Sequence, residues 1–89
     1  HLLTRHLAKR LASEHITFNA IAPGPFESKM MAFILDDPET REMVEQNVPL
    51  GRIGRPDDVA GLTIFLCSRA GAYVTGNVIP LDGGITGCG

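Results

Sequence analysis

The stretch Ile16-Thr17-Phe18-Asn19-Ala20-Ile21-Ala22-Pro23-Gly24-Pro25 decides the fold that this chain predicts. Its first part is a nearly unbroken apolar run with β-branched and aromatic residues, and the Pro-Gly-Pro sequence ends it abruptly. A short apolar run closed by Pro and Gly is typical of a strand buried on both faces, as in parallel sheets. We therefore expect a β-strand over residues 16–22, within an α/β fold.

The bend that follows, residues 23–28, admits two interpretations. In open α/β sheets, ligands bind just beyond the carboxyl ends of the strands. Gly24 has no Cβ and lets a backbone approach a ligand closely, while Pro23 and Pro25 fix φ on either side of it. On these residues alone a plain turn is the favoured reading, because turn chemistry also selects Pro and Gly.

Composition excludes several classes of protein. The chain has 89 residues, 44% hydrophobic and 20% charged, with a net charge of −2, which is ordinary for a soluble globular domain. Its basic residues are scattered and no apolar run could cross a bilayer, so we expect neither a nucleic-acid nor a membrane partner. Cys67 and Cys88 have no metal-ligand spacing, and the three histidines share no helix face. We expect free thiols in the cytoplasm and no metal.

Three further segments have a helical pattern. Residues 2–13 are amphipathic and no capping residue precedes them, so we expect the chain to begin partway through a helix of a longer protein. Asp, Pro and acidic residues at the start of 36–47 and 56–68 are typical helix beginnings. The apolar face of the first helix is expected to consist of Leu3, Leu7 and Leu11, joined by Ala8 and Ala12 on the same side.

Residues 77–82 are expected to form a second strand, and Pro80 places it at a sheet edge. Two helices would separate the two strands, which is long enough for a parallel crossover. The Gly83-Gly84 pair would close the strand, and residues 85–89 would be a frayed tail.

Three runs together resemble the C-terminal third of a short-chain dehydrogenase/reductase. The resemblance covers essentially the whole chain, and residues 25–30 and 36–38 are most similar to the 3-oxoacyl-carrier-protein reductases of rhamnolipid synthesis. It implies a doubly wound Rossmann fold in which residues 1–89 are the C-terminal portion of one domain, with the last two strands and flanking helices. The three runs are N-A-I-A-P-G at 19–24, P-L-G-R-I-G-R-P-D-D-V-A at 49–60 and Y-V-T-G-N-V-I-P-L-D-G-G at 73–84.

The resemblance implies an NAD(P)-dependent oxidoreductase that moves hydride between a nicotinamide and a carbonyl or alcohol carbon, including that of a 3-oxoacyl thioester. NAD and NADP both remain open, with NADP slightly favoured, and the intact protein would be a homodimer or homotetramer. By the same resemblance, the bend wraps the nicotinamide end of the cofactor. The backbone of Phe26 would contact the carboxamide, and Ser28 would replace a threonine that hydrogen-bonds the cofactor. The cofactor-binding residues would be Pro23, Gly24, Pro25, Phe26 and Ser28.

The resemblance makes residues 30–47 a mobile substrate lid. Its apolar side chains suit an adaptable pocket, although an ordinary core role is the alternative. The lid residues would be Met30, Met31, Phe33 and Ile34.

We assign no catalytic residue. The family's Tyr-x-x-x-Lys pair is absent, because no lysine stands four residues after Tyr73. The chain alone is therefore expected to be inactive. Asn19 is expected to be a hydrogen-bonded structural amide, Asp57 and Asp58 to stabilise a helix N-terminus, and Asp82 to belong to a turn. The alternative function is a non-catalytic interaction module acting through residues 78–81 and the last helix; a piece with no function is a third possibility.

Overall fold

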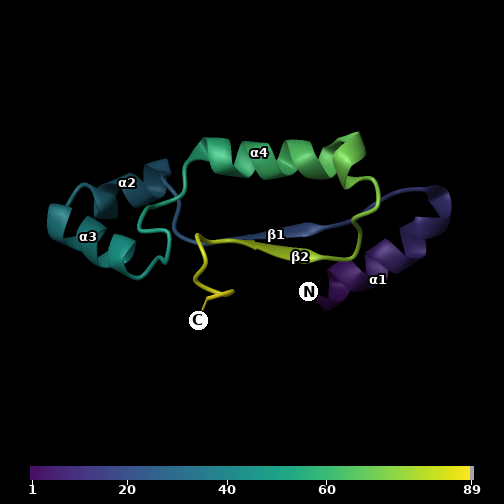
Figure 1. The fold of residues 1–89 in the computed structure, drawn as a ribbon, viewed down its shortest axis with the longest axis horizontal. Coiled ribbons are helices and arrows are strands. Elements are labelled where there is room, and N and C mark those ends of the chain that lie inside the picture. The colour runs from purple at the N-terminus through teal and green to yellow at the C-terminus, as the bar shows by residue number, and fades with distance from the viewer. Residues whose placement is uncertain (89) are drawn as a thin grey trace. The chain divides into compact units, whose positions relative to one another are not determined.

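The computed structural model describes residues 1–88, which form a two-stranded sheet, four α-helices and two 3-10 turns (Figure 1). The chain divides into two compact units, one of residues 1–22 and 60–79 and one of residues 23–59 with the chain from Pro80 onward. None of the helices in this described part is long and apolar enough to cross a membrane. In chain order the elements are α1 (Leu2–Leu11), η1 (Ala12–Glu14), β1 (Ala20–Pro23), α2 (Lys29–Leu35), α3 (Pro38–Gln46), α4 (Pro56–Cys67), η2 (Arg69–Gly71) and β2 (Val78–Leu81).

β1 and β2 pair in parallel. The amide of Ala20 donates to the carbonyl of Asn77 and that of Gly24 to the carbonyl of Leu81, both at 2.9 Å. The later residue of β1 pairs with the later residue of β2, so the two strands run in the same direction. Every second residue of β2 directs its N–H and C=O toward β1. Pro80 lies between two such residues, so its nitrogen faces away from β1 and no ladder hydrogen bond is lost.

The expected strand over residues 16–22 is shorter and lies further along the chain. It begins at Ala20 and includes Pro23, and its residues are half-buried or exposed, not buried on both faces. The preceding residues make their hydrogen bonds elsewhere: the amide of Phe18 donates to Thr75 Oγ1 at 3.0 Å. β1 is not fully buried because β2 is the only strand beside it among residues 1–88.

Asn19 anchors the entry to β1 within the first unit. Its Nδ2 donates to the carbonyl of Val74 at 2.9 Å, and its Oδ1 accepts the amide of Asn77 at 3.1 Å. The amide therefore satisfies both of its polar ends against one loop, which confirms its structural role.

The expected apolar face of α1 is covered in part: Ala8 is buried, and Leu7 and Leu11 are half-buried. Thr4 and Ala8 are its buried residues, whereas Leu3 is 68% exposed. A Cβ at Gly76 would stand only 3.5 Å from the Cβ of Ala8, so small residues allow a close approach here. Leu3, at the start of the leucine stripe, is left exposed, and the periodicity alone could not reveal that.

Three α-helices, not two, separate the strands along the chain, because residues 29–35, in the second unit, form a helix of their own. α2 and α3 lie side by side (Figure 1). α3 begins as predicted: Asp37 is its N-cap, accepting the amide of Glu39 at 3.4 Å, and Pro38 is its first residue. The buried apolar side chains of this unit are Leu35, Val48 and Ile53.

The end of the chain is folded as far as residue 88, so the prediction of a frayed tail was wrong there. Asp82 Oδ1 accepts the amide of Gly84 at 3.0 Å, and its Oδ2 accepts the hydroxyl of Thr86 at 2.6 Å. The amide of Cys88 donates to the carbonyl of Gly84 at 2.8 Å. The bonds to the Asp82 carboxylate confirm the turn expected there, and they lower the pKa of this carboxyl, chiefly through the Thr86 hydroxyl.

Candidate cofactor loop and lid

The loop of residues 23–28 leaves the carboxyl end of β1, the edge where open α/β sheets bind ligands. Pro23 closes the strand itself. Gly24 continues the pairing, because its amide donates to Leu81. A Cβ at Gly24 would lie 2.6 Å from the Cβ and 2.9 Å from the Cα of Asp82. The close approach that requires this glycine is therefore to the end of β2.

The peptide at Phe26 is held from one side by a single residue. Gly54 donates its amide to the carbonyl of Pro25 and accepts the amide of Glu27, both at 2.9 Å. This is an isolated parallel bridge between Phe26 and Gly54. In a parallel bridge one residue bonds the two neighbours of the residue opposite it. That opposite residue then directs its own N–H and C=O to the other side. The N–H and C=O of Phe26 are thus directed together away from Gly54.

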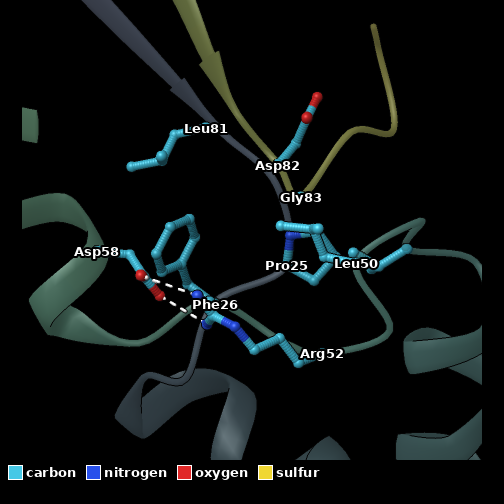
Figure 2. Close-up of a pocket in the computed structure, with 10 residues that line it drawn as sticks. Pro25, Phe26, Leu50, Arg52, Asp58, Leu81, Asp82 and Gly83 are labelled. Carbon is cyan, nitrogen blue, oxygen red and sulfur yellow. Dashed lines mark hydrogen bonds and ion pairs between the residues drawn. The ribbon is translucent and has the colours of Figure 1, made fainter. Parts of the chain in front are cut away.

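The ring of Phe26 lies against Gly54 and borders a hollow of about 190 Å³ (Figure 2). A Cβ at residue 54 would stand 2.5 Å from the ring atom Cε1, so the ring occupies the space a side chain would fill. The rest of the wall is mostly apolar, while the Asp82 side chain points away from it in the same view. The hollow is lined by Pro25, Phe26, Val48, Leu50, Arg52, Gly54, Asp58, Leu81, Asp82 and Gly83.

A charged pair stands beside this hollow. Nη1 and Nη2 of Arg52 donate to the two carboxylate oxygens of Asp58 at 2.8 and 3.0 Å, as dashed lines show in Figure 2. Asp58 Oδ2 also accepts the amide of Arg55 at 2.8 Å. The hydrogen bonds from Arg52, and then that from the Arg55 amide, hold the pKa of Asp58 well below its usual range. Asp58 thus caps the beginning of α4, which confirms the helix-terminal role expected for it.

Ser28 is the N-cap of α2. Its Oγ accepts the amide of Met31 at 3.1 Å. A hydroxyl keeps its own hydrogen when it accepts a hydrogen bond, so this group can still donate one to a ligand. Sequence reasoning did not foresee the cap, because residues 29–35 were not expected to form a helix.

A second hollow, of about 250 Å³, opens beside Ser28. Arg41 bridges its wall by donating to Glu27 at 2.8 Å and to Glu45 at 3.0 Å. These two hydrogen bonds, that with Glu27 first, raise the pKa of Arg41. The ion pair ties the loop to α3. The lining residues are Glu27, Ser28, Ala32, Leu35, Asp36 and Arg41.

The four residues predicted for a lid lie on α2, mostly toward solvent. Met30 is 88% and Phe33 89% exposed, Ile34 is exposed as well, and Met31 is half-buried. Leu35 is the residue that α2 buries. Residues 1–88 therefore do not use the apolar side of α2 as core.

The structure brings Pro25 and Phe26 to the first hollow and Ser28 to the second, while Pro23 and Gly24 line neither. It adds Gly54, Arg52 and Asp58, which the sequence did not single out for the loop. The pairing of an arginine with the third residue of a Pro-initiated helix is a signal that could have located Arg52. Nothing in the sequence points to Gly54. Within the described residues, no group of three or more His, Cys, Asp or Glu could hold a metal ion.

Known proteins share this chain's sequence and structure. It is 54% identical over 84 residues to the rhamnolipids biosynthesis 3-oxoacyl-[acyl-carrier-protein] reductase of Pseudomonas aeruginosa, covering 94% of this chain and 33% of that protein. It is 42% identical over 82 residues to the 3-oxoacyl-[acyl-carrier-protein] reductase FabG of Aquifex aeolicus, covering 92% and 32%. The Pseudomonas aeruginosa RhlG/NADP active-site complex superposes with a TM-score of 0.88 at 52% identity, over 94% of this chain and 33% of that one.

These structural similarities show the fold class. The described strands and helices are part of a Rossmann-type α/β fold with a parallel sheet, as the sequence predicted. Residues 1–86 match the family model described as enoyl-(acyl carrier protein) reductase. The chain belongs to the short-chain dehydrogenase/reductase family, which confirms the resemblance of its three runs. It spans about a third of the length of the curated relatives it matches.

Proposed function

We propose that this chain is the nicotinamide-side portion of an NADP-dependent reductase that transfers hydride to the carbonyl of a 3-oxoacyl thioester. NADP is favoured over NAD because the RhlG complex is described with NADP. In this proposal residues 1–89 are the C-terminal portion of one Rossmann domain, and the rest of the domain supplies the Tyr-x-x-x-Lys pair and the phosphate loop. The intact enzyme would act in the cytoplasm as a homodimer or homotetramer.

One observation carries the proposal: Phe26 directs its N–H and C=O together away from Gly54, on a loop at the carboxyl end of β1. A carboxamide offers an NH₂ donor and a C=O acceptor. One residue that directs its backbone N–H and C=O to the same side can bond both the carboxamide oxygen and the carboxamide NH₂. The nicotinamide carboxamide is the cofactor group with this pattern, and when bound NADPH supplies the hydride.

Ser28 supports the same assignment from the other end of the loop. Its hydroxyl hydrogen is available for a carboxamide or pyrophosphate oxygen while its oxygen accepts the amide of Met31. Pro23, Gly24 and Pro25 would set the course of the backbone between β1 and Phe26. Gly24 does so by letting the chain pass close to Asp82.

The exposed apolar side of α2 supports a substrate lid. Met30 and Phe33 present flexible or aromatic surface to solvent, with Ile34 beside them. An acyl chain is an apolar ligand that such surface would cover, and the flexible Met side chain adapts to chains of different shape. Met31, half-buried, would support the lid from below.

The experiment is a chimera in which this chain replaces the matching 84-residue segment of the Pseudomonas aeruginosa 3-oxoacyl reductase. We expect the purified chimera to bind NADPH and to reduce a 3-oxoacyl thioester. The same enzyme with the segment deleted is the negative control. A chimera that melts cooperatively and yet binds no NADPH would overturn the proposed function.

A further inference from the structure

We propose that Arg52 and Asp58 are positioning residues for the cofactor, acting through Gly54 on the peptide of Phe26. This inference rests on the proposed function. It names residues outside the cofactor loop that would set how well the loop holds the nicotinamide.

The first step is the anchoring of residues 52–55 to α4. Asp58 receives hydrogen bonds from both Nη atoms of Arg52 and from the amide of Arg55. Arg52 Nη1 also donates to the carbonyl of Ile53 at 3.3 Å. A bidentate guanidinium–carboxylate pair fixes direction as well as distance. The segment between Arg52 and Arg55 is therefore fixed at both ends to one carboxylate.

The second step is the position of Gly54 inside that anchored segment. Its amide and carbonyl bond the residues on either side of Phe26. Residue 54 has no side chain, and the Phe26 ring fills that space. Movement of residues 52–55 would thus move the backbone at Phe26 directly, because two hydrogen bonds at 2.9 Å and the ring contact join them.

Asp57 separates positioning from a general effect of negative charge on the helix dipole. Asp57 and Asp58 both place a negative charge in the first turn of α4, where either one favours the helix dipole. Asp58 alone of these two bonds Arg52 and the Arg55 amide in the structure. Asp57 is exposed. A role through the dipole predicts equal effects at both positions, and a role through Gly54 predicts an effect at Asp58 alone.

The test compares Asp58→Asn, Arg52→Lys and the matched control Asp57→Asn in the chimera. Two ligands are titrated: NADPH, and 2′-phospho-ADP-ribose, which lacks the nicotinamide. We expect Asp58→Asn to raise the Kd of NADPH by roughly tenfold, the size of one or two lost net hydrogen bonds. The Kd of 2′-phospho-ADP-ribose should not change. Arg52→Lys, which keeps the charge but not the fork, should show a smaller shift of the same kind.

The rescue variant Asp58→Glu keeps a carboxylate at the third helical position, where Glu also bonds back to the N-cap amide. It should recover most of the NADPH affinity. Equal weakening of both ligands, equal effects of Asp57→Asn and Asp58→Asn, or unchanged NADPH affinity in Asp58→Asn would each overturn the inference. If Asp58→Asn does not fold, Arg52→Lys and Asp58→Glu decide the question. These outcomes leave the proposed function standing, since the parent chimera tests that separately.

Discussion

Gly24 and Asp82 approach so closely that residue 24 has no room for a side chain. A Cβ there would stand 2.6 Å from the Asp82 Cβ and 2.9 Å from its Cα. The second of these atoms is backbone, at the end of β2, and cannot rotate away. The glycine of the Pro-Gly bend is thus required by the pairing of two parallel strands, whatever the loop binds.

We expect Gly24→Ala to lower the stability of the chimera by about 1–3 kcal/mol, the usual range for overpacking. Thermal unfolding would measure it. Gly61→Ala is the control, because its added Cβ would meet no heavy atom within 4 Å beyond the neighbouring backbone of its own helix, and alanine favours a helix. A Gly24→Ala protein that melts with the parent would contradict the crowded geometry.

Ser28 combines a helix cap with a proposed contact to the cofactor, and three substitutions separate the two roles. Ser28→Ala should lose both: about 1 kcal/mol of stability through the lost cap, and NADPH affinity. Ser28→Asp keeps a capping oxygen but has no hydrogen to donate, so it should restore stability without restoring NADPH binding. Ser28→Thr should retain both. If NADPH affinity follows thermal stability across the three variants, Ser28 acts only as a helix cap and the proposed contact with the cofactor is excluded.

Phe33 is exposed in the described chain, so its truncation should not harm the fold. We expect Phe33→Ala to change stability by less than about 0.5 kcal/mol, as for other exposed positions. As a lid residue it should raise the KM of the chimera for a long 3-oxoacyl thioester more than for a short one, with NADPH affinity unchanged. Tyr73→Ala, the truncation of an exposed aromatic side chain outside residues 30–47, is the control. Equal KM changes for short and long substrates would exclude the lid role.

The Asp58 carboxyl predicts a defined pH dependence. Its pKa in the folded protein lies below its ordinary value of 3.8, first because of Arg52 and then because of the Arg55 amide. Such a group stabilises the fold above the unfolded pKa, and the gain is lost as pH falls through the folded pKa. The melting-temperature difference between the chimera and its Asp58→Asn variant should stay constant from about pH 8 to pH 5. It should shrink only below pH 3.8. A difference that already falls between neutral pH and pH 5 would mean that another group controls this region.

Local chemistry was predictable from sequence where it concerned neighbours along the chain. Asp37 and Pro38 begin α3 as expected, because cap and first turn lie within a few residues. The amide of Asn19 was expected to be satisfied, but its partners Val74 and Asn77 lie more than fifty residues away and no local pattern reveals them. The same limit applies to the loop itself.

Burial was the least predictable property, because it depends on what packs against an element. The periodicity of α1 placed Leu3 and Ala8 on one inward face, and the described chain buries Ala8 but leaves Leu3 exposed. Gly54 looked like a loop residue until the structure placed the Phe26 ring against it. Long-range contacts of this kind decide the candidate site, and only the folded chain shows them.

The isolated 89-residue chain should lack a cooperative unfolding transition. Its buried apolar residues among positions 1–88 are Ala8, Leu35, Val48 and Ile53, a small core for so many ordered residues. Two strands alone make a marginal sheet, and unpaired edges with exposed apolar side chains favour association. We expect a broad melt by circular dichroism and strong binding of a hydrophobic dye, whereas the chimera should melt sharply. A sharp, concentration-independent melt of the isolated chain would contradict this, and would show that these residues fold without the partners that the exposed faces of α1 and α2 imply.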